Sequence, residues 1–186
     1  TIICATLLYF GGMDIFDAIC HSLTTLASGG YSTKNTSIAY WSSPVIHYII
    51  IFFMIIAGTN FSLLYGAMIR KQGKRLVQDE EFKTYLYSIL GASLVIAIGL
   101  ICTRNFEGFK SIELAFRDAL FQIVATMTTT GFSTSDYMSW HPILWLIILL
   151  IIPMGATAGS TSGGIKIIRL HIITKNIFYE FKRVMH

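Results

Sequence analysis

The chain has 186 residues, of which 54% are hydrophobic and 13% are charged, whereas a soluble domain carries about 25% charged residues. This composition excludes an ordinary soluble domain and indicates a membrane protein. The formal net charge is +4, but the basic residues lie between long apolar runs, as in membrane proteins, so we expect no nucleic-acid partner. The three cysteines, Cys4, Cys20 and Cys102, show no CxxC spacing and predict neither a disulfide framework nor a zinc site.

A bilayer core of ~30 Å requires about 20 apolar residues in a helix. Three stretches reach or approach this length and are predicted to span: 44–69, 85–102 and 142–173. Residues 1–12 are apolar but too short, so we expect the end of a further spanning helix in a longer protein. The stretches 14–27 and 111–128 are too short and too polar to cross lipid. They are predicted to be re-entrant helices, the second with Ser111 as its N-cap.

The charge distribution predicts the orientation. Placing 70–83 and the tail from Lys166 onward on one side collects ten basic residues there against four acidic ones. The positive-inside rule makes that side cytoplasmic. The loop 70–84 and the basic tail 175–186 are therefore expected in the cytoplasm, and the re-entrant helices are expected to enter from outside.

The chain contains an internal repeat. Residues 17–33 align without a gap on 118–134, at a shift of 101 positions. Identical pairs include Asp17 with Asp118, Gly30 with Gly131 and Thr33 with Thr134, and Pro44 later matches Pro142. The predicted unit is a span, a short helix, a Gly/Thr loop and a Pro-initiated span. Such a module packs against its siblings, and it divides the chain into residues 1–69 and 85–174.

The two Gly/Thr loops are the candidate functional segments, and we call 27–33 the first loop and 128–134 the second loop. Non-helical backbone within a membrane must be buried in protein or line a watery path, and carbonyl oxygens aimed at such a path can replace the water around a cation. Gly30 and Gly131 can adopt unusual backbone angles, and Ser28, Thr129 and Thr130 add hydroxyl oxygens. Neither loop contains Asp or Glu, which favours a monovalent ion over calcium. The alternative is two ordinary polar turns.

The last span differs from its counterpart in the first repeat. Pro153 and the Gly/Ser-rich stretch 155–164 predict two half-helices with a loop between them. This loop is expected beneath the first and second loops, where it would act as a movable gate; the alternative is close helix packing on small residues. Lys166 and Arg169 either anchor at the inner interface or hold the loop. The counterpart 44–69 has two separated glycines and Asn60, and no extended break is expected there.

Three motifs together carry a family resemblance: SGGYST followed by SPVIHYIIIFFMIIAGTNF, then TTTGFST, then GATAGSTSGGIKIIR. With them, the whole chain resembles the Trk/Ktr/HKT superfamily of potassium transporters, specifically its bacterial Trk-type membrane subunit. The resemblance implies an all-α membrane protein built from tandem helix, re-entrant pore-helix and helix repeats around a potassium-channel-like pore. Two of four repeats would be present, the second and third, so the chain alone is not expected to conduct.

The resemblance also implies residue roles and boundaries. The second repeat would comprise pore helix 14–27, filter loop 27–33 and inner helix 44–69, and the third would comprise outer helix 85–102, pore helix 111–128, filter loop 128–134 and broken inner helix 142–173. Potassium-binding filter residues would be Ser28, Gly29, Gly30, Thr129, Thr130 and Gly131, with Ala27 and Thr128 as additional candidates. The gating loop would include Gly155, Gly159, Ser160, Thr161, Gly163 and Gly164, with Lys166 and Arg169 as loop or interface anchors.

Function and partners follow from the same resemblance. We expect potassium uptake through a channel or symporter subunit in the bacterial inner membrane, with potassium as the substrate and no covalently bound cofactor. Expected partners are membrane lipid, the remaining repeats of the polypeptide, a second copy of the full-length subunit and a cytoplasmic nucleotide-binding regulatory ring protein. The basic tail is compatible with docking that ring or with lying on anionic lipid.

Two other classes compete with this interpretation. A secondary transporter with discontinuous helices, carrying sodium or another small solute, is the alternative function. An intramembrane enzyme is not expected. The stretch GSTSG at 159–163 has Thr161 where a serine protease needs its nucleophile, and the histidines show no metal-ligand spacing.

Overall fold

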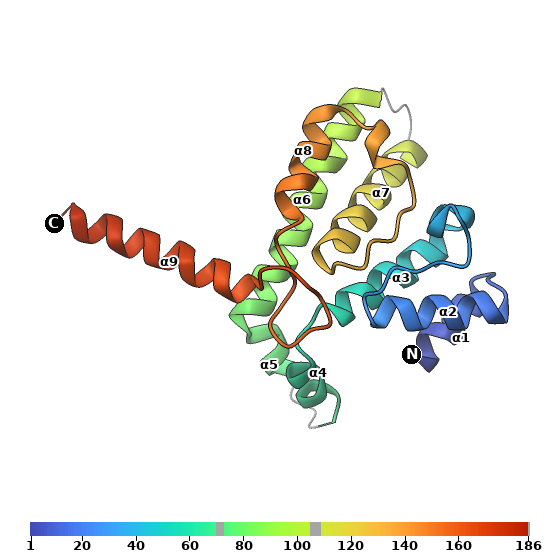
Figure 1. Ribbon diagram of the computed structural model, residues 1–186, viewed down its shortest axis with the longest axis horizontal. Helices are drawn as coiled ribbons and strands as arrows, with labels where there is room; N and C mark the ends of the chain where they lie inside the picture. The colour runs from blue at the N-terminus through green and yellow to red at the C-terminus, as the bar shows by residue number, and fades with distance from the viewer. Residues whose placement is uncertain (70–72, 105–108, 186) are drawn as a thin grey trace.

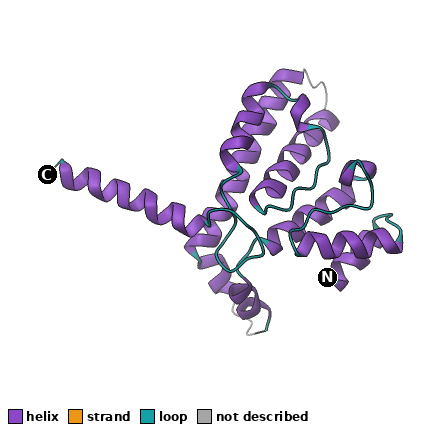
Figure 2. Ribbon diagram, in the orientation of Figure 1, coloured by secondary structure: helices purple, strands orange, loops and turns teal. Residues whose placement is uncertain are grey.

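The computed structural model describes residues 1–69, 73–104 and 109–185, and regular structure in this part of the chain is helical (Figure 2). The helices are α1 Ile2–Phe10, α2 Ile15–Leu26, α3 Pro44–Ala57, α4 Phe61–Met68, α5 Gly73–Gln78, α6 Glu80–Arg104, α7 Phe109–Met127, α8 Pro142–Ile151 and α9 Ile167–Val184. Short 3-10 turns, η1 Ser37–Tyr40 and η2 Tyr137–Ser139, lie in the segments before α3 and α8.

The helices form two similar groups that lie side by side (Figure 1). In the first group α1, α2 and α3 pack on one another, and in the second α6, α7 and α8 do the same. Proline occupies the first turn of both α3 and α8, where its fixed φ favours helix initiation and its missing N–H costs nothing. Helices α3 and α7 pack together and join the groups, so the repeat found in the sequence is also a repeat in space.

The expectation of an unbroken helix over 44–69 is wrong. Helix α3 ends at Ala57, α4 begins at Phe61, and the two are bent by 104°. Gly58 follows α3, and the Asn60 side chain accepts a hydrogen bond from the Ser62 N–H at 2.8 Å. An Asn N-cap at the start of the next helix stabilises such a break.

Other helix boundaries differ less from the predictions. Helix α6 begins at Glu80, five residues before the predicted 85. Helix α7 begins at Phe109, so Ser111 lies inside the helix and is not its N-cap. The segment 142–173 is broken, because α8 ends at Ile151 and α9 begins at Ile167. Part of the predicted cytoplasmic loop 70–84 lies at 70–72, outside the described residues.

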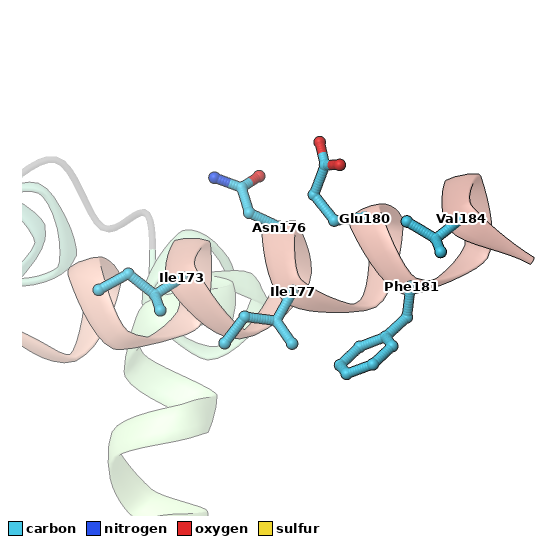
Figure 3. Close-up of a pocket in the computed structure, with 6 residues that line it drawn as sticks. All are labelled: Ile173, Asn176, Ile177, Glu180, Phe181 and Val184. Atoms are coloured by element: carbon cyan, nitrogen blue, oxygen red, sulfur yellow. The ribbon is translucent and has the colours of Figure 1, made fainter.

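By length and composition, one helix in the described ranges is long and apolar enough to cross a membrane, Glu80–Thr103. A second span is counted if the bent pair α3 and α4 is one crossing. Helix α9 projects from the body (Figure 1) and includes most of the basic tail. Its Ile177 and Phe181 side chains project on the side opposite Asn176 and Glu180 (Figure 3), which makes the tail amphipathic.

Candidate functional site: two paired loops and a third loop beneath them

The first and second loops have the same backbone conformation. Ser28 and Gly30 have φ values of 53° and 66°, and Thr129 and Gly131 have φ values of 54° and 79°. Such left-handed angles cost little at glycine but are uncommon for other residues, above all for a β-branched one. The alternation of left-handed residues therefore recurs at equivalent positions in both repeats.

Each loop begins with the same hydrogen-bonded turn. The Gly29 N–H donates to the Thr24 carbonyl at 2.8 Å, and the Thr130 N–H donates to the Ala125 carbonyl at 2.9 Å. Both bonds span five residues and close a Schellman turn at the C-terminus of α2 or α7. The last carbonyl groups of each helix, which carry the negative end of its dipole, therefore lie directly against the loop.

Each loop ends in a hydrogen bond to an aspartate of the helix that precedes it. The Thr33 hydroxyl donates to the Asp17 carboxylate at 2.7 Å, and the Thr134 hydroxyl donates to the Asp118 carboxylate at 3.1 Å. Lys34 also lies 3.4 Å from Asp17. Helix, turn and loop thus form a closed unit in both repeats, and each aspartate fixes the return path of its loop.

The two loops are in contact with each other. A Cβ on Gly30 would overlap the carbonyl oxygen of Thr130, whereas nothing described lies within 4 Å of a Cβ on Gly131. Within the described residues, the carbonyl oxygens of 27–30 and 128–131 accept no hydrogen bond. Free carbonyl groups on closely paired loops can take the place of water around a cation. The predicted filter positions thus lie together at one place in the fold.

The 155–164 loop fills the break between α3 and α4. The bend frees the carbonyl groups of Ala57 and Gly58, which have no helical partner. The Thr157 hydroxyl donates to Gly58 at 2.9 Å, and the Thr161 hydroxyl donates to Ala57 at 3.2 Å. In return, the Phe61 N–H donates to the Gly159 carbonyl at 3.2 Å. Each non-helical segment therefore satisfies the polar backbone groups of the other, as a membrane interior requires.

The 155–164 loop also contacts both of the paired loops. The hydroxyl oxygens of Ser28 and Thr161 lie 2.8 Å apart, and the Gly163 N–H donates to the Thr129 hydroxyl oxygen at 2.7 Å. The residues predicted to gate are therefore directly bonded to residues predicted to bind the ion. The other predicted gating residues lie on the same loop: Gly155, Gly159, Ser160 and Gly164.

Lys166 and Arg169 differ in their contacts, although the sequence predicts the same alternative roles for both. The Lys166 ammonium donates to the Ser162 carbonyl, to the Ser162 hydroxyl at 3.0 Å and to the Ser160 hydroxyl at 3.4 Å. Arg169 is exposed, and its side chain makes no hydrogen bond or ion pair within the described ranges. These contacts support loop holding as the role of Lys166 and give Arg169 no such role.

Sequence reasoning missed two contributors to the site. A Glu81 carboxylate oxygen accepts a hydrogen bond from the Ala158 N–H at 2.6 Å, a contact between residues far apart in the chain that no local pattern signals. The tie between Asp17 and Thr33 was also missed, although a signal existed. Both residues recur unchanged in the second repeat, at the same separation.

Paired helix–loop–helix units whose non-helical loops face one another are typical of pore-loop membrane transport proteins. A family model described as TrkH, a cation transport protein, matches residues 1–186. The chain belongs to the TrkH family, which confirms the resemblance drawn from its motifs. This family consists of transport proteins, so the expectation that the chain is not an enzyme is also confirmed.

Similar proteins agree with this assignment. The chain is 37% identical to the Trk system potassium uptake protein TrkH of Escherichia coli and 32% identical to TrkG of the same species, over its whole length in both cases. It spans 38% and 37% of these proteins. The crystal structure of the potassium transporter TrkH from Vibrio parahaemolyticus is 36% identical, with a TM-score of 0.92 over the whole chain and 39% of that protein. The all-helical fold of a membrane transporter is thereby confirmed.

Proposed function

We propose that this chain forms part of the pore of a Trk-type potassium uptake subunit, with the first and second loops as two of its filter segments. The contact between Gly30 and the Thr130 carbonyl carries the proposal. It brings the corresponding loops of two repeats together, as a shared ion path requires. Similarity to a Trk system potassium uptake protein supports potassium as the substrate.

The chemistry of the loops fits a weakly hydrated monovalent cation. Free carbonyl oxygens would replace its water, and the C-terminal ends of α2 and α7 would add negative potential at the loops. The proposed ligands lie in these loops: Ser28, Gly29, Gly30, Thr129, Thr130 and Gly131, with Ala27 and Thr128 as additional candidates. Because no carboxylate lies in either loop, a divalent ion would be bound less well.

The 155–164 loop is the proposed gate. It lies against both loops and, through Thr157 and Thr161, against the break in the inner helix. Its polar backbone groups are satisfied partly by backbone groups of the break and partly by side chains, among them Thr129, Glu81 and Lys166. Flux would follow the membrane potential whenever the loop leaves the path.

The whole protein would supply what this chain lacks. Two further repeats would complete the ring around the ion, and the subunit would cross the bacterial inner membrane several times. A second copy of the subunit and a cytoplasmic nucleotide-binding ring protein are its proposed partners. The projecting amphipathic α9 would serve as a contact with that ring or with anionic lipid.

Growth of a potassium-uptake-deficient bacterium on limiting potassium tests the proposal. The 186-residue chain is expressed beside the full-length protein that contains it, and membrane insertion is verified for both. The account predicts that the full-length protein alone restores growth. Failure of the inserted full-length protein would overturn potassium uptake, and sodium uptake by that protein would favour the sodium alternative.

A further inference from the structure

The residues that follow α2 and α7 are unusual for their positions. Ser28 and Thr129 occupy the left-handed site of a Schellman turn, where glycine is the common residue because it has no side chain to crowd the backbone. A β-branched threonine is strained there. Strained conformations of this kind persist where the surrounding structure holds them, and they are concentrated at functional sites.

Both side chains form hydrogen bonds to the 155–164 loop. The Ser28 hydroxyl meets Thr161 at 2.8 Å, and the Thr129 hydroxyl accepts from the Gly163 N–H at 2.7 Å. Glycine would relieve the strain at either position but would provide no hydroxyl. A hydroxyl residue nevertheless occupies both of these equivalent strained positions. This indicates that the hydrogen bond to the 155–164 loop determines the residue type there.

The first of these bonds has a defined direction. The Thr161 hydroxyl donates its single proton to the Ala57 carbonyl at 3.2 Å, because a carbonyl can only accept. Ser28 must therefore donate to Thr161. One continuous chain of hydrogen bonds runs from the end of α2, through the 155–164 loop, to the break after α3.

We infer that the hydroxyls of Ser28 and Thr129 are tethers that couple the paired loops to the gate, with Thr161 and Gly163 as their attachment points. The inference rests on the proposed function and adds its regulation. When the 155–164 loop moves, both strained turns lose the bonds that hold them, so opening the gate changes the filter. By reciprocity, an ion that orders the paired loops changes the position of the gate.

A double-mutant cycle in the full-length protein, reconstituted in vesicles, tests the coupling through radiolabelled rubidium flux. Ser28→Ala and Thr161→Val remove the same bond from opposite sides, and Thr161→Val also removes the bond to Ala57. Ser28→Ala is expected to raise basal flux by about twofold to tenfold, the effect of one hydrogen bond, and Thr161→Val by at least as much. The double variant is expected to match Thr161→Val alone. Thr126→Val is the matched control, because the Thr126 hydroxyl bonds within its own helix, to Gln122 at 2.7 Å. Additive effects of the two substitutions on flux would overturn the inference. It would also be overturned if Ser28→Ala changed ion selectivity while Thr161→Val left flux unchanged.

Amide hydrogen exchange at Gly163 provides a readout that does not depend on transport. Thr129→Gly removes the hydroxyl without strain and is expected to raise exchange at this amide about twofold to tenfold, whereas Thr129→Ser keeps the hydroxyl and leaves exchange unchanged. Equal exchange in the two variants would overturn the tether even if the protein transports potassium. A protein that shows the exchange difference but carries no cation would instead overturn the proposed function.

Discussion

The carbonyl oxygen of Thr130 occupies the space that a side chain on Gly30 would need. The contact joins residues from two repeats at the point where each loop turns back. It makes Gly30 necessary for two reasons, its left-handed φ of 66° and its neighbour. Gly131 has a φ of 79° but an open surrounding within the described part of the chain.

Replacement of Gly30 by alanine is expected to abolish rubidium uptake by the full-length protein. A left-handed alanine costs roughly 1–2 kcal/mol, and the clash with Thr130 must be relieved by moving the second loop. Gly91→Ala in α6 is the control, because nothing described lies within 4 Å of a Cβ at that position and Gly91 lies outside both loops. Equal uptake by the two variants would contradict the paired arrangement.

Loss of the Asp17 carboxylate is expected to loosen the first loop. Asp17→Ala removes the bond from Thr33 and the ion pair with Lys34, which predicts a loss of about 1.5–3 kcal/mol in the free energy of unfolding. Thermal unfolding of the purified full-length protein measures it. Asp14→Ala serves as control, because the Asp14 side chain makes no capping bond to α2. A destabilisation of the same size at Asp14 would argue against the tie.

Removal of the Lys166 ammonium is expected to free the gate. Lys166→Met keeps the length of the side chain but loses its bonds to Ser160 and Ser162, and basal rubidium flux should rise about threefold to tenfold. This range is modest for charge-assisted bonds because water reaches the side chain. Arg169→Met, the exposed neighbour, should leave flux unchanged. A lower flux in Lys166→Met would indicate that the lysine supports the open state instead.

The contribution of the Asn60 cap to the stability of α4 should be measurable separately. Asn60→Ala removes the acceptor for the Ser62 N–H and is predicted to cost ~1 kcal/mol in the stability of α4. Faster amide exchange in Phe61–Met68 would report it. Asn60→Asp, which retains an acceptor, should exchange like the unchanged protein, and fast exchange in that variant would show that the cap is unimportant.

Much of the site could be predicted from the sequence because the loop motif occurs in both repeats. The alignment of 17–33 on 118–134 located both loops and the two glycines, Gly30 and Gly131, that adopt left-handed angles. Composition and Pro153 located the break before α9. These are local signals, since glycine, proline and alternating polarity act through the backbone of the residues that carry them.

The bend between α3 and α4 could not be predicted in the same way. Glycine and Asn60 permit a break there, but a helix ends within a membrane only if its freed carbonyl groups find donors. Those donors are Thr157 and Thr161, which lie about a hundred residues away in the chain. The same limit applies to the early start of α6, where Glu81 reaches the Ala158 N–H. Long-range satisfaction of backbone groups decides both features.

Anomalous scattering from crystals of the full-length protein grown with rubidium tests the central claim most directly. The account predicts a rubidium peak between the first and second loops, coordinated by carbonyl oxygens of residues 28–30 and 129–131. Replacing rubidium by sodium should weaken occupancy there. A well-ordered pair of loops with no peak between them, and rubidium bound elsewhere in the protein, would contradict the claim that these loops form the filter.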